Sequence, residues 1–237
     1  MSRLIWHHPE PPGRKNALTR ASVVRAAIEV ADAGGVAALT MRAVADALGV
    51  STPMSLYRYV LNKDGLVDLM LDEVSAEVPV PAEPGADWRA DLRGLAVGLW
   101  AMIGRHRWYA ELVDGRPPFG PRTLRRAAFL LTVLDGAGLT PAVAYASLLD
   151  NYVTGTAMSV SRELVMLERF GIGSTEDLQG YAAEMADDSL APWLADMPDL
   201  TADARFELGL DCLLDGFAQR RRALSPRRRQ AGGRMAR

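Results

Sequence analysis

The residues best suited to chemistry in this chain lie between Leu39 and Lys63. The run TPMSLYRYV, which ends three residues before Lys63, places short polar and aromatic side chains beside basic ones. Hydroxyl, phenol and guanidinium groups hydrogen-bond to base edges and to phosphate oxygens, so this mixture is typical of a surface that contacts nucleic acid. The chemistry indicated is recognition of DNA, provided that local structure presents these side chains together.

A first short helix is predicted just before this run. Thr40 is a good N-cap, because its hydroxyl can accept a hydrogen bond from a free N–H of the first turn. Val44 and Leu48 recur at helical spacing and give the segment near 40–48 an apolar face. Gly49 follows the last apolar position, where a chain often needs a positive φ to leave a helix.

A second short helix is predicted near 52–59, directly after a tight turn. Ser51 or Thr52 can cap it, and Pro53 is tolerated in the first turn because the missing N–H would be unpaired there. Two short helices joined in this way have the layout of a helix-turn-helix, which places its second helix in the major groove of DNA. Two helices that merely pack together are the alternative interpretation.

The segment and its surroundings resemble the DNA-binding domain of the tetracycline-repressor (TetR) family. The matching runs within residues 18–74 are LTRASVVRAAIEVADAGGVAALTMRAVADALGV and SLYRYVLNKDGLVDLM. One departure is visible, since the turn from Val50 to Tyr57 is one residue longer than the usual family spacing. The departure leaves open which of Thr52, Met54 and Ser55 faces the bases.

The resemblance implies a set of DNA-contacting positions in this chain. Arg42 and Lys63 are expected to grip phosphates, whereas Thr52 and Ser55 are expected to read bases. The full set carried over from the family motif is Met41, Arg42, Thr52, Ser55, Tyr57, Tyr59 and Lys63.

The rest of the chain reads as helical, with no alternating β pattern and no internal repeat. We therefore predict an all-α fold: a helix-turn-helix domain over 18–78, a Pro-rich linker over 78–85, and a helical domain over 86–224. Residues 1–17 are expected to form a flexible arm and residues 225–237 a basic disordered tail. The predicted helices lie near 19–33, 40–48, 52–59, 63–77, 87–105, 107–114, 120–137, 140–169, within 176–196, and 202–223.

The second domain more loosely resembles the C-terminal domain of the tetracycline-repressor subclass, which implies binding of a small-molecule effector and homodimerisation. The last predicted helix supports a dimer through an apolar stripe (Phe206, Leu210, Leu213, Leu214, Phe217) beside a strip of small residues (Gly209, Cys212, Gly216). The segment 140–161 is apolar nearly all round. In the family these two helices form a four-helix bundle, and the dimer reads a palindromic operator. Core packing within one chain is the alternative for both helices.

Several aromatic and polar residues of the second domain are candidates for an effector cavity. Asn151 and His106 stand out as polar groups in apolar surroundings that need hydrogen-bond partners. His106 can equally be a helix-terminal residue that satisfies free carbonyls. The candidate ligand-binding residues are Trp100, His106, Phe129, Asn151 and Met158, and ordinary core packing is the alternative for each.

The effector is not expected to be tetracycline. In the family, a His before the Gly-Arg-Pro turn and a Glu further along hold the drug-bound magnesium. Here the stretch before that turn, AELVD, has no His, and alignment on Gly155 places Ser159 at the Glu position. A small, largely apolar or aromatic effector is expected instead, because Met and aromatic residues are frequent in these helices.

Other classes of function find little support in the composition. The net charge is −2, but the positive charge is concentrated in two segments. Between residues 14 and 63 there are 7 Lys/Arg and 3 Asp/Glu, and between 220 and 237 there are 8 Arg and no acid.

The single Cys212 reads as a core residue and suits a reducing cytoplasm. No paired His, nucleophile constellation or phosphate loop is present, so we expect no enzyme activity, no cofactor and no metal. No apolar run indicates a membrane segment or a signal peptide.

Two features at the ends of the chain have open interpretations. Arg14, Lys15 and Arg20 can carry the arm into a neighbouring minor groove, as arms of other DNA-binding domains do, or the arm can be a solvated leader. The Arg-rich tail can add nonspecific phosphate affinity or only solubility.

The combined expectation is a ligand-responsive regulator, most simply a repressor, that binds a double-stranded operator as a homodimer. Effector binding would shift the helix near 87–105, pull the helix near 63–77 and spread the two DNA-reading units. A regulator or activator that needs no effector is the alternative of the same fold. An enzyme that uses a helical pocket is the other class left open.

Overall fold

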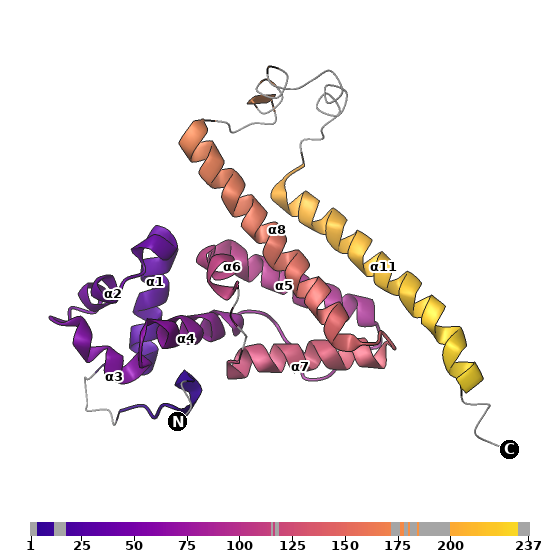
Figure 1. Ribbon diagram of the computed structural model, residues 1–237, viewed down its shortest axis with the longest axis horizontal. Coiled ribbons are helices and arrows are strands. Elements are labelled where there is room, and N and C mark those ends of the chain that lie inside the picture. The colour runs from indigo at the N-terminus through magenta and orange to yellow at the C-terminus, as the bar shows by residue number, and fades with distance from the viewer. Residues whose placement is uncertain are drawn as a thin grey trace.

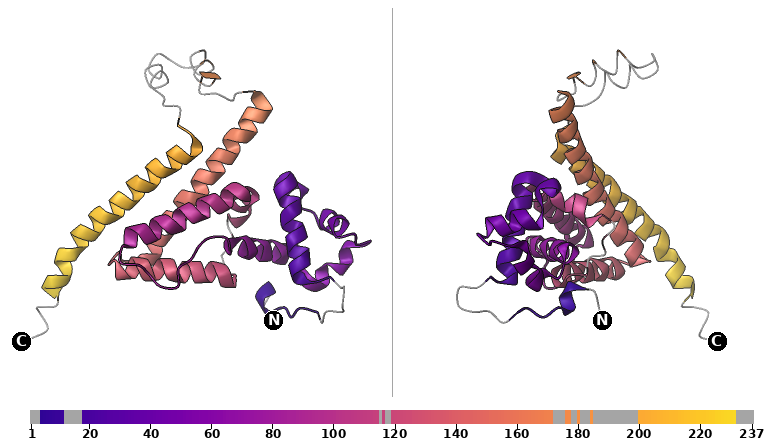
Figure 2. Two further views of the ribbon diagram at one scale, coloured as in Figure 1. Left: turned by 180° about the vertical axis from the view of Figure 1, so that it is seen from behind. Right: turned by 60° about the vertical axis from the view of Figure 1, so that its left-hand side comes forward.

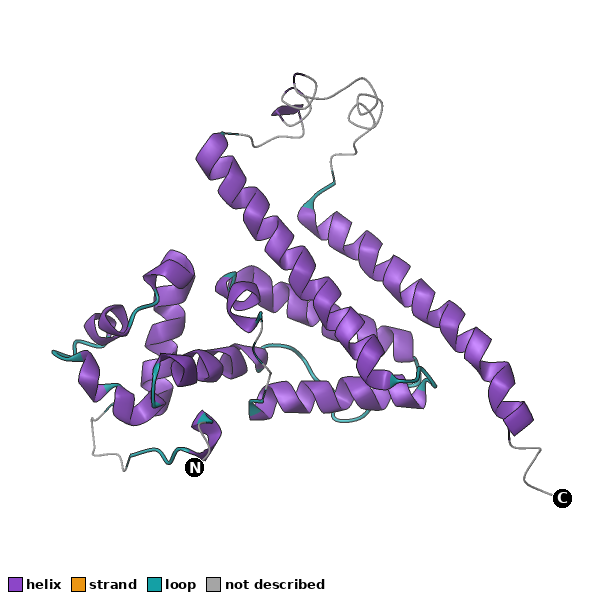
Figure 3. Ribbon diagram, in the orientation of Figure 1, coloured by secondary structure: helices purple, strands orange, loops and turns teal. Residues whose placement is uncertain are grey.

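The structure is a computed structural model that describes residues 4–11, 18–114, 116, 119–171, 176, 177, 180, 184 and 200–231. All regular elements within these ranges are helices, and no strand occurs among them (Figure 3). The all-α fold predicted from the sequence is confirmed. The predicted helix within 176–196 falls almost entirely outside the described residues.

The N-terminal helical domain consists of α1 to α4, at the indigo and purple end of Figure 1. Its helices pack around a core that includes Val23, Val44, Leu56 and Val60, all at most 1% exposed. The elements are α1 (Arg20–Ala38), α2 (Met41–Ala47), a 3-10 turn η2 (Pro53–Ser55), α3 (Tyr57–Val60) and α4 (Lys63–Ser75).

Local capping explains where these helices begin. The Thr19 hydroxyl accepts from the N–H of Ser22 and the Thr40 hydroxyl from that of Ala43, at 3.0 and 3.1 Å. Gly49 leaves α2 with a φ of 66°, the positive value that its place after the helix predicted. The predicted single helix over 52–59 is instead a 3-10 turn followed by one turn of α-helix.

The C-terminal helical domain contains α5 (Trp88–Arg105), α6 (Trp108–Val113), α7 (Pro121–Gly136), α8 (Ala142–Phe170) and α11 (Ala202–Ala231). Figures 1 and 2 show α8 and α11 as long neighbouring helices on the side away from α1–α4, and the two helices are in contact. The shorter α5, α6 and α7 lie between them and the N-terminal domain. Among the described residues, no other helix covers the outer face of α8 and α11 around Leu148, which is 52% exposed.

Two terminal segments differ from the sequence prediction. Residues 4–11 do not form a free arm, because Ile5, in the 3-10 turn η1 (Ile5–His7), is 1% exposed. At the other end, α11 continues to Ala231 and so includes much of the predicted tail. Arg, Gln and Ala favour helices, and they outnumber Pro226, the one residue between 217 and 231 that lacks a backbone N–H. The basic residues Arg14 and Lys15 lie outside the described residues.

A buried carboxylate joins the two domains. Asp72 of α4 is 2% exposed and accepts hydrogen bonds from the N–H groups of Arg122 and Thr123, at 2.9 and 3.0 Å. These are free N–H groups of the first turn of α7, so Asp72 acts as an N-cap supplied by another helix. A methyl group at Gly120 would lie only 2.1 Å from the carboxylate oxygen, so the close approach depends on glycine there.

We predict that Asp72→Ala lowers the free energy of unfolding by about 2–3 kcal/mol, because buried N–H groups of α7 lose their acceptor. The neighbouring Glu73→Ala is the matched control. Glu73 pairs with Arg122, and both side chains are about half exposed, so its loss should cost no more than about 1 kcal/mol. Urea unfolding of the two variants measures the difference, and equal losses would contradict the interdomain cap.

Candidate nucleic-acid interface and effector pocket

The turn that follows α2 presents the polar run identified in the sequence. Leu56 and Val60 are 0% exposed and anchor η2 and α3 to the core, while Arg58 between them is exposed. The Thr52 hydroxyl accepts from the N–H of Met54 at 3.4 Å, and the Ser55 hydroxyl donates to the Thr52 carbonyl at 2.8 Å. The two residues predicted to read bases therefore lie together on one exposed turn.

Two further residues belong to this surface, although the set of predicted DNA contacts does not include them. Met54 is 71% exposed, although an apolar side chain in a helical pattern is ordinarily assigned to the core. Arg58 is also exposed, on the single turn of α3. Their position in the sequence between Thr52 and Tyr59, two predicted DNA contacts, is the feature that indicates the same role. Because they share the surface of the predicted contact residues, they join the candidate set.

The remaining predicted DNA contacts occupy different environments. Met41 is 9% exposed and belongs to the core, so the side chain is not available; the residue can contact a phosphate only through its N–H in the first turn of α2. Arg42 pairs with Asp46 at 3.0 Å, with both side chains more than half exposed, so the pair can open at little cost. Tyr57 and Tyr59 are half-buried.

Lys63 stands at the first position of α4, where a phosphate can meet both a cation and helix N–H groups. Its side chain is exposed, and the Asn62 side chain caps the helix by accepting from the N–H of Gly65 at 2.7 Å. The N-terminus of a helix attracts anions through its free N–H groups and its dipole. The DNA-contacting roles of these residues stay predictions.

The largely buried His106, a predicted ligand residue, connects the two domains through its ring nitrogens. Its Nδ1 lies 2.8 Å from Asp32 of α1 and its Nε2 lies 3.0 Å from Glu77, just after α4. Trp108 Nε1 also donates to Asp32, at 2.6 Å. Burial alone would raise the pKa of Glu77, but hydrogen bonds from His106 and Arg105 outweigh it and hold that pKa below 4.5. As predicted, His106 lies at a helix end, as the C-cap of α5, but its ring contacts carboxylates instead of carbonyls.

A cavity of about 610 Å³ lies in the C-terminal domain between α5, α6, α7 and α8. Its polar centre is the pair of Arg126, 6% exposed, and Asp150, which are 2.7 Å apart. Burial alone would lower the pKa of Arg126, but Asp150 outweighs it and raises that pKa. Residues from all four helices form the apolar and polar wall, including Leu99, Tyr109, Leu130, Val143, Asn151, Thr154 and Met158.

The predicted ligand residues divide between this cavity and other places. Asn151 and Met158 line the cavity. Phe129 is 7% exposed and belongs to the core. Trp100 stacks on Phe206, with ring centroids 4.4 Å apart, and lines a separate cavity of about 180 Å³. The two that face the 610 Å³ cavity are thus the better placed candidates, and none has a ligand contact here.

The outer face of α8 and α11 forms an apolar groove. Leu148 is 52% exposed, and a hollow of about 650 Å³ between the helices is also lined by Tyr145, Cys212 and Gly216. The prediction that Cys212 is a core residue was wrong, because Cys212 and Gly216 face outward. Gly209, the third small residue of the strip, packs against the Tyr152 ring of α8 instead. The apolar stripe of α11 was expected to meet a partner subunit, but Phe206, Leu210, Leu214 and Phe217 are buried within the chain.

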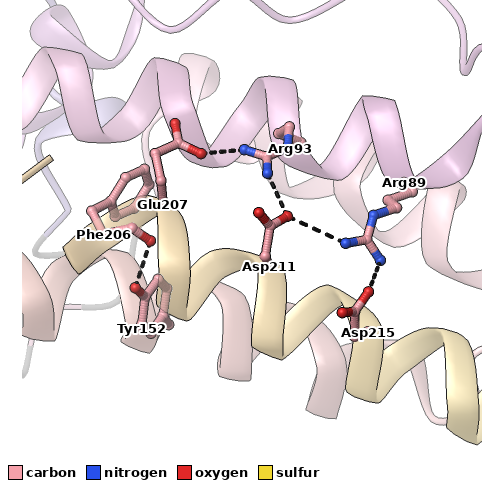
Figure 4. A network of polar contacts seen from close by, with 7 residues as sticks. All are labelled: Arg89, Arg93, Tyr152, Phe206, Glu207, Asp211 and Asp215. Atoms are coloured by element: carbon pink, nitrogen blue, oxygen red, sulfur yellow. Dashed lines mark hydrogen bonds and ion pairs between the residues drawn. The ribbon is translucent and has the colours of Figure 1, made fainter. Parts of the chain in front are cut away.

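An ion-pair ladder fixes α11 against α5. Arg93 bridges Glu207 and Asp211, and Arg89 bridges Asp211 and Asp215 (Figure 4). Beside it, the Tyr152 hydroxyl of α8 donates to the Phe206 carbonyl at 2.7 Å. The ladder does not involve Cys212 or Gly216, which line the groove.

None of the helices in the described ranges is long and apolar enough to span a membrane. The same ranges contain no cluster of three or more His, Cys, Asp or Glu residues arranged to hold a metal ion.

Comparison with known proteins identifies similar sequences over both domains. The model of bacterial regulatory proteins of the tetR family matches residues 23–70, and that of the tetracyclin repressor-like C-terminal domain matches residues 80–221. The HTH-type transcriptional repressor DrrR1 of Streptomyces coeruleorubidus is 36% identical over 94% of this chain and 88% of its own. The class A tetracycline repressor of Escherichia coli is 32% identical, covering 84% of this chain and 90% of its own.

A solved structure extends the similarity to the fold. The structure of ActR from Streptomyces coelicolor in complex with actinorhodin matches with a TM-score of 0.74 at 30% identity. The match covers 86% of this chain and 98% of that chain.

We predict that Lys63→Ala weakens binding to all DNA sequences alike and reduces the slope of log affinity against log salt by about one, because one phosphate contact is lost. Arg125→Ala is the control, since it removes the same charge from the exposed surface of α7. Fluorescence anisotropy over a salt series measures both slopes. An unchanged slope for Lys63→Ala would remove this residue from the interface.

Proposed function

The chain belongs to the tetracycline-repressor family of bacterial regulatory proteins, and we propose that it is a ligand-responsive transcriptional repressor. A homodimer binds a palindromic operator through η2 and α3 of each subunit. A small, largely apolar or aromatic effector enters the cavity between α5 and α8 and releases the protein from DNA.

The observation that carries the proposal is the position of α4, which belongs to one domain and is held by the other. The N-terminus of α4, with Asn62 and Lys63, lies directly after η2 and α3, which together form the recognition turn (residues 52–60). Near its C-terminus, Asp72 caps α7, and the phenol of Tyr109 in α6 interacts with the Ser75 hydroxyl. A movement of α6 or α7 is therefore transmitted to the surface that carries Lys63.

The cavity shares its walls with the helices that hold α4. Tyr109 lines the cavity and contacts α4, and Arg126 lies on α7, the helix that Asp72 caps. An effector that fits better when α6 or α7 is displaced shifts the population towards a displaced α4. The size of the effect depends only on the difference in affinity between the two arrangements.

The outward face of α8 and α11 supports the dimer. None of the described helices covers the apolar groove with Leu148, Cys212 and Gly216. An exposed apolar groove of this kind ordinarily marks an interface. A twofold contact there gives two recognition turns, as a palindrome requires. The predicted contact residues Met41, Arg42, Thr52, Ser55, Tyr57, Tyr59 and Lys63 belong to this proposal.

The effector class is supported by the size and lining of the cavity. A volume of about 610 Å³ lies within the usual range for drug-sized ligands. Leucines, Val143 and Met158 supply apolar contact, while Asn151 and Thr154 offer hydrogen bonds to an oxygen-bearing ring system. The similar ActR was solved with actinorhodin bound. The same cavity disfavours the alternative of a regulator that needs no effector.

We predict that the purified protein binds DNA upstream of its own gene tightly, with two subunits per site and with strong salt dependence. Anisotropy titrations at several salt concentrations test this. A library of aromatic compounds is then added to the preformed complex, and release by largely apolar members is expected. Release only by small charged metabolites would contradict the effector class, and tight binding without any release would favour the effector-independent alternative.

We predict that Leu148→Glu converts the protein to a monomer and lowers operator affinity by at least about tenfold, because a charge enters the apolar groove. Leu124→Glu on α7 is the matched control, since the two leucines are 52% and 49% exposed. Light scattering after size exclusion gives the mass of each variant. A dimeric Leu148→Glu would place the interface elsewhere.

A further inference from the structure

We infer that residues 4–11, the N-terminal strap, position the recognition turn and so determine operator affinity without contacting DNA. The strap precedes the residues matched by the family DNA-binding model, which begin at 23. The inference deepens the proposed function, because its effect on affinity presupposes operator binding. The effect of the strap on the structure of α3 does not depend on operator binding.

The strap is anchored by one fully buried side chain. Ile5 is 1% exposed, in contact with the core of α1–α4, and η1 packs on α4. Gly65 in the first turn of α4 is part of this contact, since a methyl group there would lie 3.4 Å from Ile5 Cβ. The anchor therefore lies beside Lys63, at the end of α4 that faces the recognition turn.

Polar groups of the strap hold the end of α3. Arg20 at the start of α1 donates from Nε to the Tyr59 carbonyl at 2.9 Å and from Nη2 to the His8 carbonyl at 2.7 Å. His8 Nε2 lies 3.3 Å from the Arg58 carbonyl, and donates to it when Nε2 carries the proton. Glu10 accepts from the backbone N–H of Arg20 at 2.7 Å.

These contacts matter because α3 is only four residues long. A helix of one turn has negligible stability of its own, and the last carbonyls of a helix have no partner within it. The Arg58 and Tyr59 carbonyls are such groups, and Arg20 and His8 satisfy them. The chain then turns sharply at Leu61, a non-glycine residue with a φ of 65°, which needs support from its surroundings.

The charge of the strap distinguishes this role from that of an arm in the minor groove. Residues 4–11 read LIWHHPEP and contain no Lys or Arg, so they carry no fixed positive charge to phosphates. Arg20, one of the three basic residues suggested for such an arm, already uses its guanidinium on two protein carbonyls. The strap therefore acts through α3 and α4.

Ile5→Asp tests the inference, with His7→Asp as the matched control. Both variants add one negative charge to the same segment, but His7 is exposed whereas Ile5 is buried. We expect Ile5→Asp to weaken operator binding by at least about tenfold, because a carboxylate in the apolar site releases the strap. His7→Asp should stay within about twofold, and affinity for nonspecific DNA should change little in either variant. Equal weakening by both variants would overturn the inference in favour of simple charge repulsion.

A second experiment uses Arg20→Lys. This variant keeps the positive charge but loses the forked guanidinium that reaches the two carbonyls. Weakened specific binding with an unchanged salt slope is expected. A direct phosphate contact predicts nearly unchanged affinity instead, and that result would overturn the inference.

Hydrogen exchange reports on the structure independently of DNA. In Ile5→Asp, and in the milder Ile5→Ala if the first variant is unstable, amides of residues 57–66 should exchange faster while those of 88–113 keep their wild-type rates. Unchanged exchange in 57–66 would overturn the inference. If the wild-type protein binds no operator, the proposed function fails, and the exchange measurement still decides whether the strap holds α3.

Discussion

The structure depends on a single carboxylate at the boundary of its two domains. Asp72 lies on α4 yet completes the first turn of α7, so neither helix can move without the other or without breaking buried hydrogen bonds. His106 adds a second joint, from the end of α5 to Asp32 and Glu77. Together they make α4 a rigid connection between a cavity and a surface, which is what ligand control of DNA binding requires.

Features set by neighbouring residues were predictable from the sequence. Thr40 and Gly49 begin and end α2 where capping and a positive φ require, and the helical pattern placed the longer helices correctly. Contacts between distant residues were not predictable. Nothing local distinguishes Asp72 from an exposed acid on α4. His106 was recognised as a polar group in need of partners, yet its partners lie 74 and 29 residues away.

The candidate site shows the same division. The run around Thr52 and Ser55 was recognised because its residues are adjacent, whereas the burial of Met41 follows from packing that no motif records. On α11 the sequence shows both the apolar stripe and the strip of small residues, but it does not show which of the two faces the core. Contacts with other helices decide this, since Phe206 stacks on Trp100 of α5 and the Arg89 and Arg93 ladder lies beside that contact.

The separation between joint and cavity has a consequence for how such proteins diversify. Asp72, Gly120 and Thr123 make the joint and do not line the 610 Å³ cavity, whereas Asn151, Thr154 and Met158 line the cavity and take no part in the joint. Substitutions on α8 can therefore change what is sensed while the output remains intact. A biosensor for a different molecule can be engineered on this scaffold by redesigning a few positions of one helix.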